Sequence, residues 1–172
     1  MTFLQEKIYP IVPVFVQNAM ISAFGYQWQK RRFGGCFPDF LQEVRAREFF
    51  DVVQWQEIQT NSLRNLLVHA FNNVQFYHSK YLSAGFSEVD LENFNLTDLK
   101  HLPFLEKDEL RQFGTTTLLA KKLSKGIFIS SSGSTGTPTR IYLPQYFHQK
   151  WTAVIEARVR NWAGVDRFSP RG

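Results

Sequence analysis

Apolar side chains recur at intervals of three and four residues along the first half of the chain, the spacing that places them on one face of a helix. This pattern predicts one helix from about Val14 to Arg31 and a second from Asp39 to about Gln59. A third helix is expected after Asn61, because the Asn61 side chain can accept a hydrogen bond from the first free N–H groups and so cap it.

The second and third helices are expected to face the core. Their apolar positions are Leu41, Val44, Phe49, Val52, Val53 and Trp55 in the second helix, and Leu63, Leu66, Leu67, Ala70, Phe71 and Val74 in the third. Residues 85–99 are polar and rich in turn formers, which predicts an exposed connection. Lys107 then opens a short helix that ends near Thr115.

The first helix allows two interpretations. Val16, Met20, Ala23 and Phe24 share one face, and the cations at residues 30–32 suit the C-terminal end of the helix dipole. Packing against the domain is favoured, and contact with a membrane surface is the alternative. Residues 8–26 are not a convincing membrane span, because polar residues and prolines interrupt a stretch that needs about 20 apolar residues. The basic cluster also follows this stretch, which is the wrong side for a signal peptide.

The last third of the chain has a mixed pattern. Two short β-prone runs, Ile127–Ile129 and Arg140–Leu143, predict strands. Pro144 then introduces a predicted helix over residues 145–163, with Gly164 as its stop. The helix has a wide apolar stripe that is expected to cover a sheet face, made of Phe147, Trp151, Val154, Ile155, Val159 and Trp162.

The loop between the two predicted strands carries the clearest chemical signal. Residues 130–139 read SSSGSTGTPT, with seven hydroxyl side chains and two glycines. Glycine lets the backbone approach an anion closely, and hydroxyl and N–H groups donate hydrogen bonds to it, so the pattern is typical of a phosphate-binding loop. A flexible Gly/Ser linker is the alternative, and the strands on both sides argue against it. The loop lacks the Gly-Lys-Ser/Thr ending of a Walker loop.

Composition narrows the class of protein. With 172 residues, 44% of them hydrophobic and 16% aromatic, the chain fits about one globular domain. Its net charge of +5 permits an anionic partner, but the cations are scattered and no nucleic-acid recognition motif is present. The single cysteine, Cys36, cannot form an intramolecular disulfide, and no Cys/His group has metal-site spacing. We therefore expect a cytoplasmic protein, with attachment to the membrane surface as the alternative.

Residues 131–139, SSGSTGTPT, resemble the phosphate loop of the adenylate-forming (AMP-binding) enzyme superfamily. Many members end this loop in Pro-Lys, whereas Pro138-Thr139 is similar to the phenylacetate-CoA ligase-like branch, which includes capsular polysaccharide biosynthesis proteins. Further segments that resemble this branch are LRNLLVHAFNNVQFYHSKY at 63–81, LTDLKHLPFLEKDELRQ at 96–112 and GVDR at 164–167.

The resemblance implies an α/β fold with a helical N-terminal layer and the first strands of a sheet around the Ser/Thr/Gly phosphate loop. It would divide the chain into three parts: an amphipathic segment at 1–35, a helical region at 36–125 and an incomplete strand-loop-strand-helix region at 126–172. Family members are considerably longer, and their segments for adenine, carboxylate and magnesium and their catalytic lysine lie downstream. The chain is therefore expected to be the truncated N-terminal part of a ligase, with the rest on a continuation polypeptide as one possibility.

The implied activity is ATP-dependent conversion of a small carboxylate to an acyl-adenylate, with Mg²⁺ as cofactor and CoA as one acyl acceptor, in polysaccharide or acyl-conjugate biosynthesis. The implied nucleotide-binding residues are Ser131, Ser132, Gly133, Ser134, Thr135, Gly136, Thr137, Pro138 and Thr139. Arg140 is a candidate to replace part of the charge of the missing lysine. No catalytic residue or metal ligand is assigned. A non-catalytic remnant or membrane-associated interaction module is the alternative, and the chain alone is expected to bind ATP weakly or not at all.

Overall fold

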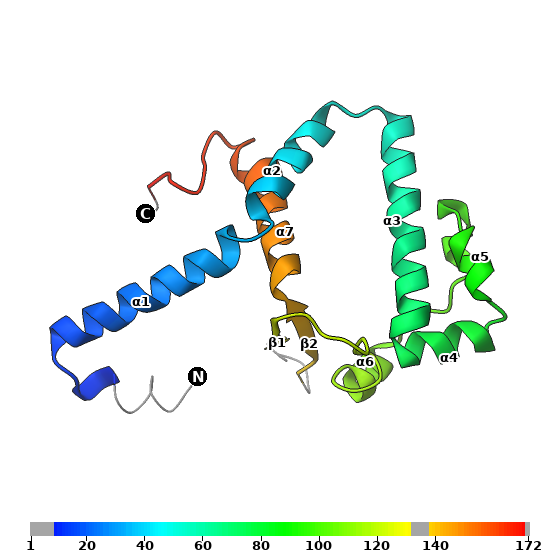
Figure 1. The fold of residues 1–172 in the computed structure, drawn as a ribbon, viewed down its shortest axis with the longest axis horizontal. Coiled ribbons are helices and arrows are strands. Elements are labelled where there is room, and N and C mark those ends of the chain that lie inside the picture. The colour runs from blue at the N-terminus through cyan, green and yellow to red at the C-terminus, as the bar shows by residue number, and fades with distance from the viewer. Residues whose placement is uncertain (1–8, 132–137, 171–172) are drawn as a thin grey trace. The chain divides into compact units, whose positions relative to one another are not determined.

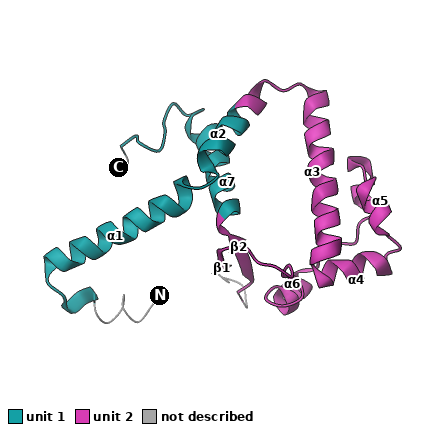
Figure 2. Cartoon of the chain, viewed as in Figure 1, with its two compact units in different colours: residues 1–45, 146–172 teal, residues 46–145 magenta. Residues whose placement is uncertain are grey.

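The chain forms two compact units, which we describe from a computed structural model of residues 9–131 and 138–170. Unit 1 joins residues 1–45 with residues 146–172, and unit 2 comprises residues 46–145 (Figure 2). The described residues are mostly helical, with a small antiparallel sheet of two strands in unit 2 (Figure 1). This composition is compatible with the predicted α/β class.

Unit 1 contains a short 3-10 helix (Tyr9–Ile11) and three α-helices: α1 (Val14–Phe33), α2 (Phe37–Ala46) and α7 (Gln145–Ile155). A π-helical turn, Glu156–Arg160, continues α7. The core lies between α2 and α7, where the fully buried Phe37 packs with the buried Leu41, Val44, Ala153 and Ala157. The small side chains of α7 leave room for the bulky side chains of α2.

The face of α7 that packs against α2 is not the one predicted. Trp151 is 57% exposed and Phe147 51% exposed, so the expectation that the apolar stripe covers a sheet is wrong for these residues. The buried residues are instead small or polar: Gln149, Thr152, Ala153, Glu156 and Ala157.

Hydrogen bonds satisfy the buried side chains of Gln149 and Glu156. The Gln149 amide donates from Nε2 to the carbonyl oxygen of Arg31 at 3.1 Å, and its Oε1 accepts from the Cys36 N–H at 3.3 Å. Glu156 accepts from Arg160 Nη1 at 2.8 Å and from the Arg167 N–H at 2.6 Å. These bonds explain how a glutamine and a glutamate can lie on the buried face of this helix, outside the predicted apolar stripe.

His148 of α7 gives unit 1 a testable pH dependence. Partial burial lowers the pKa of His148 below its ordinary 6.5, and the positive charges of Arg32 and Arg31 lower it further. The folded state therefore favours the neutral imidazole, whereas the unfolded chain takes up a proton first as the pH falls. We expect the free energy of unfolding to decrease as the pH falls below about 6.5.

Urea unfolding at about pH 7.5 and about pH 5.5 measures this effect. His148→Gln should reduce the stability lost between the two values, because glutamine does not titrate. Asp166 and Glu109, whose pKa values are lowered by hydrogen bonds from Phe168 and Lys80 respectively, titrate at lower pH and should leave this difference intact. An identical loss in the variant and the natural sequence would contradict the assignment.

Helix α1 forms where it was predicted, but its side chains are at most half-buried. None of its residues is buried, and Phe15 and Phe24 are 74% and 59% exposed. Of the apolar face predicted to pack against the domain, Val16 and Met20 are half-buried, whereas Ala23 and Phe24 are exposed. No helix among those residues has the length and apolar character needed to cross a bilayer.

Unit 2 is built around the long helix α3 (Val52–Asn73). The 3-10 helix Arg47–Phe49 precedes α3. The elements that follow are α4 (Gln75–Ser83), α5 (Glu88–Glu92), the 3-10 helix Leu96–His101, α6 (Lys107–Phe113), β1 (Gly126–Ser130) and β2 (Arg140–Pro144). Helices α4 and α5 pack against α3 (Figure 1).

The boundaries of α3 correct the prediction of a helix from Asp39 to Gln59 and a new one after Asn61. The break lies earlier, at Asp51, because a capping box forms there: Asp51 Oδ1 accepts from the Gln54 N–H at 2.8 Å, and Gln54 Oε1 accepts from the Asp51 N–H at 3.0 Å. Asn61 lies inside α3 and caps nothing. Val52 and Val53, which were predicted to face the core, directly follow this break and are 71% and 70% exposed.

The core of unit 2 includes residues that the sequence pattern placed on the surface. Leu67, Ala70 and Phe71 of α3 are buried as predicted, whereas Leu66 is 62% exposed. Leu91 is fully buried, so the prediction that residues 85–99 form an exposed connection is wrong at this position. Burial and the neighbouring Tyr77 raise the pKa of the core residue Tyr81 to about 12.

Candidate phosphate-binding site

The predicted strands form an antiparallel hairpin. Strand β1 pairs with β2 so that Gly126 faces Pro144, Phe128 faces Tyr142 and Ser130 faces Arg140. This register confirms both predicted strands, which residues 131–139 connect along the chain.

Hydrogen bonds hold the two ends of this loop together. The Ser131 N–H donates to the carbonyl oxygen of Thr139 at 3.0 Å, and the Thr139 N–H donates to Ser131 Oγ at 3.0 Å. Thr139 is buried, whereas Ser131 and Pro138 are exposed. These three are the only predicted binding residues that the structure describes, and Ser132, Gly133, Ser134, Thr135, Gly136 and Thr137 lie outside the described residues.

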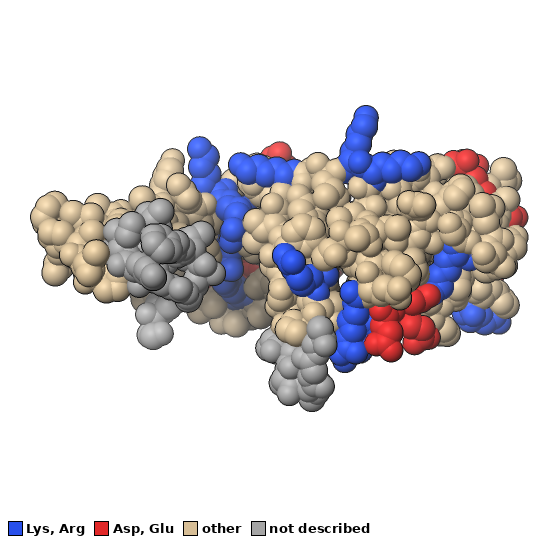
Figure 3. Space-filling view, turned by 90° about the horizontal axis from the view of Figure 1, so that it is seen from below, with Lys and Arg blue, Asp and Glu red and all other residues tan. Residues whose placement is uncertain are grey.

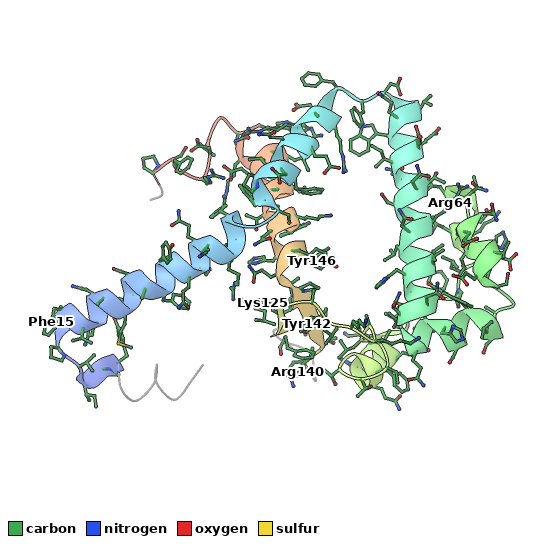
Figure 4. All side chains as sticks on the ribbon, in the orientation of Figure 1. Phe15, Arg64, Lys125, Arg140, Tyr142 and Tyr146 are labelled. Carbon is green, nitrogen blue, oxygen red and sulfur yellow. The ribbon has the colours of Figure 1, made fainter. Side chains whose placement is uncertain are left out.

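The two faces of the hairpin differ in chemistry. Because side chains alternate along a strand, Ile127, Ile129, Ile141 and Leu143 share one face. The other face carries Phe128 and Tyr142, whose rings contact edge to face with centroids 5.1 Å apart. The Arg140 guanidinium lies 5.2 Å from the centroid of the Phe128 ring, so a positive charge is held beside the entrance of the loop (Figure 4).

Close packing fixes the base of the hairpin. The Tyr142 hydroxyl donates to the carbonyl oxygen of Ser124 at 2.6 Å. A Cβ atom on Gly126 would lie 2.5 Å from the Leu143 oxygen and 2.8 Å from Tyr142 Cζ, so only glycine fits there without a shift. The end of α6 also approaches β2 closely, since a Cβ on Gly114 would lie 3.1 Å from the Arg140 oxygen. Sequence reasoning missed both glycine contacts, because neither glycine stands in a recognisable turn motif.

The lysines that precede the hairpin divide into two kinds. Lys121 donates from Nζ to the carbonyl oxygen of Asn72 at 2.8 Å, so its charge satisfies the C-terminal end of α3. Lys122 and Lys125 are exposed. Lys121 therefore has a structural role at the end of α3.

A cavity of about 570 Å³ in unit 2 is a second place where a ligand could be sought. Its wall includes His78 and Lys121 but neither Ser131 nor Thr139. His78 Nδ1 lies 3.0 Å from the carbonyl oxygen of Phe71, and Lys121 is engaged as described above. Both side chains thus satisfy the terminal carbonyls of α3, and no residue named in the cavity wall has a buried side-chain nitrogen or oxygen without a hydrogen-bond partner.

The described residues do not fit a magnesium site. No group of three or more His, Cys, Asp or Glu side chains within residues 9–131 and 138–170 could hold a metal ion. We therefore assign no Mg²⁺ ligand in this chain.

Comparisons with known proteins connect the chain to one enzyme family, although no family model matches it. The chain is 30% identical over 118 residues to phenylacetate-coenzyme A ligase of Escherichia coli (strain K12), which covers 68% of this chain and 26% of that enzyme. It is 31% identical over 107 residues to the Pseudomonas putida enzyme of the same name, covering 62% of this chain and 24% of the relative. It is 25% identical over 151 residues to Protein CapK of Staphylococcus aureus, covering 87% of this chain and 31% of the relative.

These similarities relate the chain to a class of ligases. The chain belongs to the phenylacetate-CoA ligase-like family, as the SSGSTGTPT loop predicts. It spans about a quarter of the length of the phenylacetate-CoA ligases that it matches.

Proposed function

We propose that this chain supplies the phosphate-binding loop of an ATP-dependent ligase that activates a carboxylate as an acyl-adenylate. The observation that carries the proposal is the hairpin: two paired strands present a loop of hydroxyl and glycine residues whose ends are held together by the Ser131 and Thr139 hydrogen bonds. The names of the relatives support ligase chemistry with CoA as a substrate.

The proposed roles follow from the chemistry of the loop residues. Hydroxyl groups of Ser131, Ser132, Ser134, Thr135 and Thr137 donate hydrogen bonds to β- and γ-phosphate oxygens, and Gly133 and Gly136 permit the close approach of the backbone. Pro138 and the buried Thr139 fix the exit of the loop. Pyrophosphate gains charge as it leaves the α-phosphorus, and such positioned donors stabilise that charge.

Arg140 has a specific part in this proposal. Many adenylate-forming enzymes place a lysine where this chain has Thr139, and the Arg140 guanidinium beside Phe128 brings a fixed positive charge to the neighbouring position. Its contact with the ring limits its freedom and leaves its charge beside the loop entrance.

The remaining parts of the reaction are also proposals. The substrates are ATP and a small carboxylate, CoA is one acceptor, and the product belongs to polysaccharide or acyl-conjugate biosynthesis. Mg²⁺ would neutralise phosphate charge when bound, and residues beyond those described here would hold it. We assign the groups that bind adenine and the carboxylate to polypeptide that corresponds to the part of the longer relatives beyond the matched region.

A second candidate function is a non-catalytic interaction module. The exposed aliphatic face of the hairpin favours it, since Ile127, Ile129 and Ile141 are 41%, 42% and 47% exposed and would suit another polypeptide. Calorimetric titration of the chain with ATP and Mg²⁺ separates the candidates. A weak but saturable heat that Arg140→Gln diminishes supports the phosphate loop, whereas a complete absence of heat favours the module.

A further inference from the structure

The net positive charge of the chain comes entirely from unit 1. Residues 1–45 and 146–172 contain ten Lys or Arg and five Asp or Glu, a net charge of +5. Residues 46–145 contain ten of each, a net charge of zero. Charge asymmetry of this kind indicates an extended anionic partner for the basic part rather than a general requirement for solubility.

Within unit 1, helix α1 separates apolar and cationic character along its length. It contains no Asp or Glu, and its only charged residues are Lys30, Arg31 and Arg32 in the last turn. In Figure 3 the part of α1 that lies away from this turn shows neither acidic nor basic side chains on the face in view. The helix therefore offers an uncharged segment followed by a cationic last turn, in which Lys30 is exposed and Arg31 and Arg32 are half-buried.

The uncharged segment is apolar and exposed. Val14, Ile21 and Phe24, which lie on one side of the helix, are 69%, 55% and 59% exposed. Phe15, near the start of the helix, is 74% exposed (Figure 4). Asn18, Ser22 and Gln29 follow a narrow stripe at helical spacing with Gly25. Exposed apolar surface of this extent marks an interaction site.

We propose that α1 lies on the surface of a bilayer that contains anionic lipids. Apolar side chains such as Ile21 and Phe24 would enter the boundary between headgroups and acyl chains, the polar stripe would remain in contact with water, and Lys30 would approach the lipid phosphates. The exposed aliphatic and phenylalanine side chains favour a bilayer over a nucleic acid, because the nucleic-acid backbone attracts cationic side chains but offers no apolar surface to these residues. The helix lies on the bilayer because it is not apolar enough to cross one.

Flotation of the full chain with lipid vesicles tests this proposal. Vesicles of phosphatidylcholine with about one third phosphatidylglycerol should bind the chain about tenfold more strongly than phosphatidylcholine alone, and added salt should weaken the binding. Ile21→Gln/Phe24→Gln should reduce binding about tenfold. Neither side chain is buried, so the variant should keep its helical circular dichroism.

Two matched variants serve as controls. Leu66→Gln/Val89→Gln removes apolar side chains of similar exposure, 62% and 64%, from unit 2, and Lys100→Gln removes one exposed cation from unit 2. Both should bind vesicles like the natural sequence, whereas Lys30→Gln should bind more weakly. Equal binding to both kinds of vesicle, or full binding by Ile21→Gln/Phe24→Gln, would overturn the proposal. Retention on duplex DNA at the same salt concentration that exceeds vesicle binding would also overturn it.

Discussion

Alanine at both Ser134 and Thr135 is expected to lower carboxylate-dependent exchange of labelled pyrophosphate into ATP more than about tenfold, equivalent to over about 1.4 kcal/mol of transition-state stabilisation. Each hydroxyl is proposed to donate a hydrogen bond to a phosphate oxygen that gains charge as pyrophosphate leaves. The exchange is measured in the E. coli relative after its corresponding segment has been replaced by residues 126–144 of this chain, which include both strands and the loop.

The hairpin provides a matched control for this prediction. Ser130 is exposed and lies on the Arg140 side of the sheet, so Ser130→Ala removes a neighbouring hydroxyl that has no proposed phosphate contact. Exchange should stay close to that of the unmodified chimera. If Ser134→Ala/Thr135→Ala leaves exchange unchanged while the chimera is active, the loop does not bind the phosphates.

Phe37→Ala is expected to destabilise unit 1 by about 3 to 5 kcal/mol, a typical loss for a large aromatic side chain removed from a core. Phe37 is fully buried, its ring lies 5.1 Å from the Phe33 ring, and it packs with Ala153 and Ala157 of α7. Its loss therefore weakens the interface that joins the beginning of the chain to its later part. A loss of this size is a large fraction of the stability of a small domain.

Hydrogen exchange resolves where the destabilisation occurs. Amides of α2 and α7 should exchange faster in Phe37→Ala, whereas the central amides of α3, which belong to the separate core of unit 2, should keep their protection. Phe37→Leu should show a smaller effect, and Phe15→Ala, which alters a 74% exposed side chain, should change stability by less than about 0.5 kcal/mol. Equal acceleration in α2 and α3 would show that the two cores do not unfold separately.

Much of the local structure follows from the sequence because it depends on neighbouring residues. Strands β1 and β2 are predicted by β-prone runs on both sides of a turn-rich loop, and the start of α6 at Lys107 is also predicted. The boundary of α3 was missed because two candidate caps compete: Asp51 has Gln54 at the third helical position and forms a reciprocal capping box, whereas Asn61 does not.

The errors concern which helix face becomes buried. Periodicity locates the apolar stripe of α7 but not its partner, and the packed face is set instead by the fit of Ala153 and Ala157 to Phe37. Gln149 and Glu156 can join this face because the backbone of distant segments, at Arg31, Cys36 and Arg167, completes their hydrogen bonds. Such distant partners cannot be deduced from the spacing of residues along one helix.

In the candidate site, too, the features that depend on neighbouring residues are predicted from the sequence, and the contacts between distant residues are not. The phosphate-binding residues are predicted from the composition of the loop and from the family resemblance. Two contacts depend instead on strand register: the hydrogen bond between Ser131 and Thr139, and the position of Arg140 over Phe128. An amide at one end of the loop finds a hydroxyl at the other only after β1 and β2 have paired.

The most direct test of the proposed function is to follow the backbone amide resonances of the 172-residue chain during titration with ATP. This measurement detects weak binding and locates it. We predict saturable shift changes concentrated at residues 131–140, which disappear in Ser134→Ala/Thr135→Ala and persist in Ser130→Ala. Shift changes that centre instead on the cavity beside His78 and Lys121, or that remain unchanged in the double variant, would contradict the assignment of this loop as a nucleotide phosphate site.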